Sequence, residues 1–94
     1  KEFAEAAIIS FTEFKTNYSL FLQKRDEENF RRAGHKIKPV AQMLGLNSIV
    51  DEYENAKKII WEEKPDSDIQ SSIIKMDKTC NQVLNELENI SSNE

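Results

Sequence analysis

The 94-residue chain is poor in the residues on which many binding and catalytic sites depend, with one cysteine, one histidine, two glycines and two prolines. A lone cysteine, Cys80, forms no disulfide within the chain, and one cysteine with one histidine cannot build a Cys/His metal cage. Two glycines are too few for a Gly-rich phosphate-binding loop. The longest apolar run, residues 6–9, is far below the roughly 20 residues of a bilayer span. We therefore expect a soluble, cytoplasmic protein without structural zinc, Walker-type ATP binding or membrane insertion.

The size of the chain limits the classes of protein to which it can belong. Its 94 residues are 38% hydrophobic and 32% charged, with a formal net charge of −4. This is enough for one hydrophobic core but not for a nucleotide-binding domain joined to a substrate domain. Because the chain begins with Lys1 rather than Met, we expect a module of a longer protein. We treat residues 1–94 as one domain.

The hydrophobic pattern is helical throughout, because apolar residues recur at intervals of three and four. We predict four helices, at approximately Glu2–Arg25, Glu27–Leu44 with Gly45 as its C-cap, Asn47 or Ser48 to Lys64, and Asp66 or Ser67 to Ile90, with residues 91–94 as a frayed tail. A capping-box pattern at Ser10 and Glu13 leaves open a division of the first helix into two. Short connectors favour antiparallel neighbours. The expected fold class is an all-α, up-down-up-down antiparallel four-helix bundle.

The predicted core consists of one apolar stripe on each helix. The four stripes are Ala4, Ala7, Phe11, Phe14, Tyr18 and Phe21; Phe30, Ala33, Ile37, Ala41 and Leu44; Ile49, Tyr53, Ala56 and Ile60; and Ile69, Ile73, Met76, Cys80, Val83, Leu87 and Ile90. We expect Cys80 to be a buried small hydrophobe rather than a nucleophile. Trp61 lies beside its stripe, and we expect it to be a half-buried cap on the end of the bundle, with a contact to a partner protein as the lesser alternative.

The second helix is basic although the chain is acidic, because residues 29–50 contain no Asp or Glu but four Lys and Arg. On a helical wheel with about 100° per residue, His35 lies roughly 170° from the centre of the apolar stripe, close to Arg31, Lys38, Pro39 and Gln42. Nearby positive charge disfavours the imidazolium and would attract a phosphoryl group. The alternative is an ordinary surface histidine on a solvated face.

Pro39 lies inside the predicted second helix, where proline costs about 3 kcal/mol because it removes a donor and crowds the carbonyl four residues earlier. That carbonyl belongs to His35. We therefore expect a local bend next to the only histidine.

The second helix also resembles the signature of a known family. Residues 26–38, DEENFRRAGHKIK, followed by Leu44-Gly45-Leu46, are similar to the phosphoacceptor helix of histidine phosphotransfer (HPt) domains of multistep two-component signalling. In that family an Asp opens the helix, a small residue precedes the histidine, an apolar residue and a lysine follow at the second and third positions, and a Gly closes the helix. The four-helix plan agrees over the whole chain, and the specific part covers about 20 residues.

The resemblance implies that His35 accepts a phosphoryl group from the aspartate of one receiver domain and donates it to another. Lys38 would then neutralise the phosphoryl oxygens. The chain would have no autokinase activity and no cofactor, because Mg²⁺ belongs to the partner receiver. Position 39 departs from the family, which usually has Gly there. The expected partners are response-regulator receiver domains and a hybrid sensor kinase, with the chain itself a monomer.

A basic patch on an acidic protein would orient the acidic pocket of a receiver during docking. The candidate docking residues surround His35 and extend onto the opposite face of the first helix: Arg31, Arg32, Pro39, Gln42, Met43, Leu20 and Ile9. For each apolar member, a packing role or simple surface exposure is at least as good an interpretation.

Three other functions compete with phosphotransfer. Nucleic-acid binding is disfavoured because three acids offset the six basic residues between Lys24 and Lys38 and no aromatic platform accompanies them. Metal binding at His35 lacks ligands, since no Asp or Glu lies within one helical turn of it. The strongest alternative is a helical adaptor that binds receiver domains or other signalling proteins without being phosphorylated. The presence of both His35 and Lys38 favours active transfer.

Overall fold

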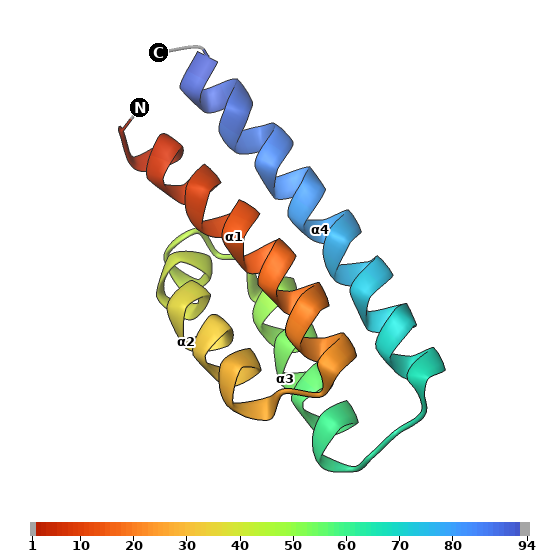
Figure 1. The fold of residues 1–94 in the computed structure, drawn as a ribbon. Helices are drawn as coiled ribbons and strands as arrows, with labels where there is room; N and C mark the ends of the chain where they lie inside the picture. The colour runs from red at the N-terminus through yellow and green to blue at the C-terminus, as the bar shows by residue number, and fades with distance from the viewer. Residues whose placement is uncertain (1, 93–94) are drawn as a thin grey trace.

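A computed structural model describes residues 2–92 as a bundle of four helices, each antiparallel to the helix before it (Figure 1). The helices are α1 (Glu2–Lys24), α2 (Glu27–Met43), α3 (Asn47–Trp61) and α4 (Asp66–Ser92). α1 packs against α2 and α4, and α3 packs against the same two helices, so the four surround one core. The predicted all-α four-helix bundle is confirmed, and α1 is a single helix.

The first and last helices of the chain are much longer than the two between them. α1 and α4 have 23 and 27 residues, whereas α2 and α3 have 17 and 15. The N-terminal part of α1 and the C-terminal part of α4 therefore continue side by side beyond the α2–α3 hairpin (Figure 1), which gives a molecule of 45 × 20 × 20 Å. Beyond the hairpin, the bundle is only two helices thick.

The core agrees with the predicted stripes except at four positions near helix ends. Phe21, Leu44 and Ile60 are only partly buried, while Leu22 and Ile59 take the buried positions on α1 and α3. Leu22 lies closer than Phe21 to the centre of the α1 stripe, and Ile59 faces the groove between α3 and α4. Ile90 is 50% exposed because it lies on the part of α4 that projects past the hairpin.

Three helices end in the same backbone motif, with the residue after the C-cap in the left-handed region. These residues are Arg25 (φ 54°), Gly45 (φ 71°) and Glu63 (φ 53°). The next amide in each case bonds back to the carbonyl five residues earlier: Asp26 to Phe21 at 2.9 Å, Leu46 to Ala41 at 2.8 Å and Lys64 to Ile59 at 3.0 Å. Each is a Schellman arrangement. Only Gly45 was predictable, because glycine is the residue that signals this conformation.

The helix boundaries correct two further expectations, the N-cap of α3 and the frayed tail after α4. Asp26 caps α2 by accepting a hydrogen bond from the Asn29 amide at 3.3 Å. α3 begins at Asn47 as one of the two expected starts, but its N-cap is Leu46, and neither Asn47 nor Ser48 supplies a side-chain cap. Helix α4 continues through residues 91 and 92, where a frayed tail was predicted; residues 93–94 lie outside the described part of the chain.

One buried polar chain joins three helices. The Tyr18 hydroxyl of α1 lies 2.6 Å from the Ser72 hydroxyl of α4, which donates to the Glu52 carboxylate of α3 at 2.7 Å. Because the single proton of the Ser72 hydroxyl is donated to Glu52, Tyr18 is the donor in its bond to Ser72. Burial raises the pKa of Tyr18. These hydrogen bonds fix the relative positions of α1, α3 and α4.

None of the helices described within residues 2–92 has both the length and the apolar character needed to cross a bilayer.

Candidate functional site

His35 lies in the middle of α2 with its side chain exposed, as the helical wheel predicted. The opposite face of α2 carries Phe30, Ala33, Ile37 and Ala41, all buried in the core, and Leu44 packs against the core from its edge. The same spacing that buries these residues therefore turns the only histidine toward solvent.

The residue before the histidine is held against the ring of a tyrosine from the next helix. Gly34 is buried, and a Cβ atom built on it would lie 1.9 Å from Cζ of Tyr53. The Tyr53 side chain is 2% exposed and its hydroxyl donates a hydrogen bond to the Arg31 carbonyl of α2 at 3.3 Å. Only a residue without a side chain fits at position 34, so the α2 backbone lies directly against the Tyr53 ring of α3 next to His35.

The four basic residues near His35 are each paired with a carboxylate from outside the acid-free segment. Arg32 lies 2.9 Å from Glu28 and Arg31 lies 4.0 Å from Glu27, both one turn earlier on α2. Lys36 lies 2.9 Å from Glu13 of α1, and Lys38 lies 2.8 Å from Glu54 of α3. The local positive field is thus weaker than the charge count of α2 alone indicates, because three helices contribute to the surface around His35.

Lys38 is the least exposed of these four cations, and it contacts both Glu54 and Tyr53. Its side chain is 31% exposed, its ammonium contacts Glu54, and it lies 6.0 Å from the centre of the Tyr53 ring. Lys57 binds the other Glu54 oxygen at 2.8 Å. Hydrogen bonds from the two lysines hold the pKa of Glu54 below its usual range. Glu54 is therefore ionised at neutral pH and holds the Lys38 ammonium on the α3 side of the site.

Pro39 does not interrupt α2, which continues to Met43. The proline is exposed and lacks an amide proton, so the His35 carbonyl receives no hydrogen bond from residue 39. The bend expected there stays a prediction.

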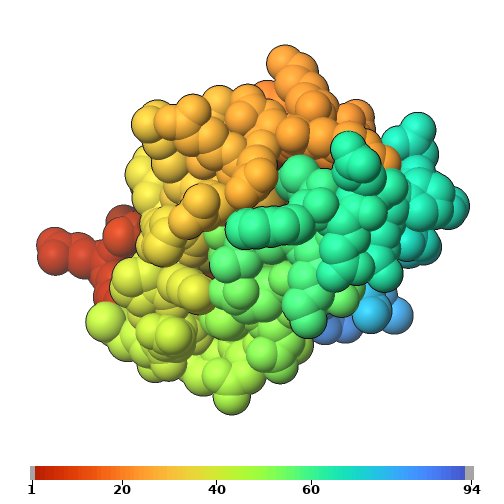
Figure 2. All heavy atoms as spheres, turned by 90° about the horizontal axis from the view of Figure 1, so that it is seen from below, coloured from red at the N-terminus to blue at the C-terminus, as the bar shows by residue number. Residues whose placement is uncertain are grey.

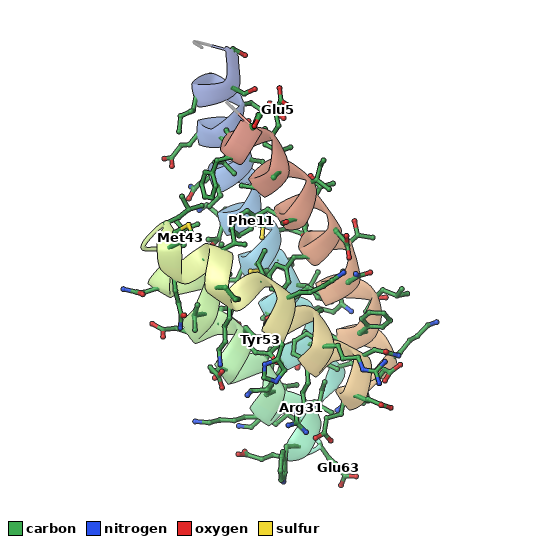
Figure 3. All side chains as sticks on the ribbon, turned by 90° about the vertical axis from the view of Figure 1, so that its left-hand side faces the viewer. Glu5, Phe11, Arg31, Met43, Tyr53 and Glu63 are labelled. Atoms are coloured by element: carbon green, nitrogen blue, oxygen red, sulfur yellow. The ribbon has the colours of Figure 1, made fainter. Side chains whose placement is uncertain are left out.

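The apolar candidates for docking are exposed, but they belong to two separated levels of the bundle. Ile9 is 67% exposed and Leu20 is 42% exposed, on α1, and Met43 is 72% exposed at the end of α2. The ion pair between Glu13 and Lys36 fixes the register of the two helices and puts Ile9 near the Met43 end. Gln42 is exposed beside Met43, next to the end of α2 that Figure 3 marks with the Met43 label.

A shallow groove on the α2 surface contains His35, Arg31 and Arg32 together with Glu27 and Glu28. Among residues 2–92, no three His, Cys, Asp or Glu side chains lie close enough together to hold a metal ion. Cys80 is buried as predicted, and burial raises the pKa of its thiol to about 12, so it is not a nucleophile at neutral pH.

Sequence reasoning missed two contributors to this surface. The stripe assigned Tyr53 to the core, but nothing in its spacing indicated that its ring contacts Gly34 and attracts Lys38. Glu54 was missed because the register between α2 and α3 is not encoded in a local pattern. The prediction for Trp61 was wrong. Its side chain is 74% exposed and is not a half-buried cap, because α3 ends there and no other described element covers it.

Comparison of the chain with protein-family models, with curated proteins and with solved structures found no match. The assignment of a function therefore depends on the residues of this chain.

Proposed function

We propose that this chain is a phosphorelay intermediate in which His35 receives a phosphoryl group from the aspartyl phosphate of one receiver domain and passes it to the aspartate of another. The observation that carries the proposal is the exposed imidazole in the middle of α2, with a lysine one turn away and a glycine fixed against Tyr53 beside it. The resemblance of residues 26–46 to HPt domains supports the same role.

The reaction needs only the imidazole of this chain as a nucleophile. A neutral ring nitrogen attacks phosphorus, so that an N–P bond forms while the acyl phosphate O–P bond breaks and its electrons leave on the receiver's carboxylate. The ring keeps its proton on the other nitrogen and becomes cationic. Attack by the aspartate of the second receiver reverses these changes. The receiver supplies the Mg²⁺ that these relays use.

Lys38 would stabilise the phosphoryl oxygens by moving part of its contact from Glu54 to the phosphate. Each such contact in water contributes about 1 kcal/mol or less, since both side chains are partly exposed. Lys38 therefore tunes the transfer and is not required for the histidine to react. Arg31 and Arg32 flank the same groove and add to the attraction for an incoming dianion.

The test is incubation of the chain with a receiver domain carrying a ³²P-labelled aspartyl phosphate. We expect an acid-labile, base-stable label on the chain that disappears in His35→Gln, while the matched exposed substitution Lys78→Gln on α4 retains it. A label that persists in His35→Gln would contradict the assignment. A receiver that binds the chain without transferring label would instead indicate a helical adaptor.

Lys38→Ala should slow transfer by up to about fivefold, which corresponds to about 1 kcal/mol, without unfolding the bundle. Circular dichroism is the control for folding. A large loss of helicity would show that the contact of Lys38 with Glu54 and Tyr53 is structural instead.

A further inference from the structure

Trp61 is an exposed aromatic at the C-terminal end of α3. It is the only tryptophan of the chain, and 74% of its surface is accessible. The two residues before it behave differently, because Ile59 is buried and Ile60 packs against the core. The bundle therefore does not need the Trp61 ring for its own packing. Tryptophan, with tyrosine and arginine, is enriched among the residues that contribute most of the binding energy at protein interfaces.

The ring borders a groove that is continuous with the groove at His35. Trp61 and Lys57 of α3 line it together with Glu27 and Arg31 of α2. Glu27 and Arg31 also line the groove that contains His35. Figure 3 shows Arg31 on α2 between Tyr53 and the α3–α4 connection marked by Glu63, and Figure 2 shows that end of the bundle with α2 and α3 adjoining. One surface thus extends along α2 from the histidine to the tryptophan.

The separation of His35 and Trp61 is small enough for one partner domain to cover both. Glu27 precedes His35 by eight residues, which is about 12 Å along α2, and neighbouring helices are about 9 Å apart. Trp61, level with Glu27 on the next helix, is thus about 15 Å from the histidine. An interface of about 800 Å² on each partner, if round, reaches about 16 Å from its centre. A domain centred on His35 reaches Trp61.

We propose that Trp61 is an anchor for the receiver domain, which docks over both α2 and α3 with its phosphorylation site at His35 and an apolar pocket over the tryptophan ring. This inference rests on the proposed phosphotransfer. The occupant is a receiver because this groove shares Glu27 and Arg31 with the groove that contains His35, the phosphoacceptor of the proposed function. It adds the α3 side to the docking surface. The docking candidates from the sequence extended from α2 toward Ile9 and Leu20 of α1, and a partner contact was the lesser alternative for Trp61.

The lone tryptophan allows docking to be followed directly in the unmodified chain. The probe is the receiver domain that labels His35, prepared with its own tryptophans replaced by phenylalanine. On titration, the Trp61 emission should shift to shorter wavelength as the ring leaves water, and it should not change when the chain is concentrated alone. A shift on concentrating the chain alone would mean that a second copy covers the ring, which overturns the proposal.

Trp61→Ala provides the kinetic test, with Ile74→Ala on α4 as a matched control because Ile74 is 68% exposed and lies outside both grooves. We expect Trp61→Ala to raise the KM for the phosphorylated receiver about thirtyfold, which corresponds to about 2 kcal/mol, with kcat unchanged. Ile74→Ala should leave both constants at their original values. A change in Trp61→Ala no larger than in the control would overturn the proposal.

Phosphoramidate separates this inference from the function on which it rests. It phosphorylates imidazole directly, with cleavage of its own P–N bond and release of ammonia, and needs no docking surface. Trp61→Ala and the original chain should be labelled at equal rates by phosphoramidate, and only the receiver reaction should be impaired. Normal transfer from the receiver in Trp61→Ala would refute the anchor alone, whereas an unlabelled His35 with both donors would refute the proposed function and the anchor with it.

Discussion

Replacing Gly34 by alanine tests whether the contact between α2 and α3 positions the histidine. The new Cβ would lie 1.9, 2.2 and 2.4 Å from three carbons of the Tyr53 ring, whereas ordinary contacts begin near 3.4 Å. The ring must therefore move by about 1.5 Å or α2 must retreat by the same amount. The Tyr53 ring has little room to move, because the centre of the Phe30 ring lies 5.2 Å from its own centre and its hydroxyl donates a hydrogen bond to the Arg31 carbonyl.

Two terms of opposite sign determine the change in stability. Alanine inside a helix is favoured over glycine by about 1 kcal/mol, while overpacking a rigid core costs about 1–3 kcal/mol and more where neither side yields. Because the three close contacts are to a buried ring, we expect the second term to exceed the first and Gly34→Ala to lose about 2 kcal/mol. For a domain of this size that lowers Tm by about 8–16 °C.

Thermal unfolding followed by circular dichroism measures the effect, and a double-mutant cycle identifies its cause. In a Tyr53→Leu background the smaller side chain leaves room for the new methyl group, so Gly34→Ala should there recover the helix-propensity gain and become neutral or stabilising. If Gly34→Ala raised Tm in the original chain, as at an exposed helix position, the tight contact and its role in positioning His35 would be refuted.

Three further predictions concern groups away from the glycine. Glu54→Gln should raise the steady-state phosphorylation of His35 several-fold, measured with phosphoramidate, because the carboxylate no longer competes for Lys38; a decrease would show that Glu54 presents the lysine to the phosphate. Burial raises the pKa of the Cys80 thiol to about 12, so the stability that this protonated thiol contributes is complete below about pH 8.5 and falls above it by up to about 1.4 kcal/mol per pH unit. Urea unfolding from pH 8 to 10 should show a shallower decline in Cys80→Ala, and parallel declines would contradict this. Ser72→Ala should cost about 1–3 kcal/mol in urea unfolding, because Tyr18 keeps only a 3.5 Å contact to a backbone carbonyl; an unchanged midpoint would mean that water replaces the hydroxyl.

The sequence predicted what depends on one helix and missed what depends on two. The apolar spacing of α2 was enough to bury Phe30 and Ile37 and to expose His35, because all three positions follow from one helical period. The partners of Lys36 and Lys38 come from α1 and α3, and their pairing follows from how far each helix is displaced along its neighbour. No local pattern encodes that displacement.

The helix ends show a second limit of the same kind. Gly45 predicted the left-handed residue after α2. Arg25 and Glu63 adopt the same conformation without any sequence signal, because the backbone hydrogen bonds to the preceding turn compensate for their unfavourable φ. An early end at Trp61 instead of Lys64 follows from the second of these turns. It leaves the tryptophan on the surface beside the groove that leads to His35.

Tyr53 connects these observations, although α3 supplies no group that reacts. Its ring sets how closely α2 approaches at Gly34, its hydroxyl bonds to the Arg31 carbonyl, and Lys38 and Lys57 lie over it at 6.0 and 5.2 Å. The position of the histidine, the location of Lys38 and the spacing of the α2–α3 groove therefore depend on one buried side chain. A change at Tyr53 should alter phosphotransfer and receiver docking together, whereas changes at His35 and Trp61 should separate them.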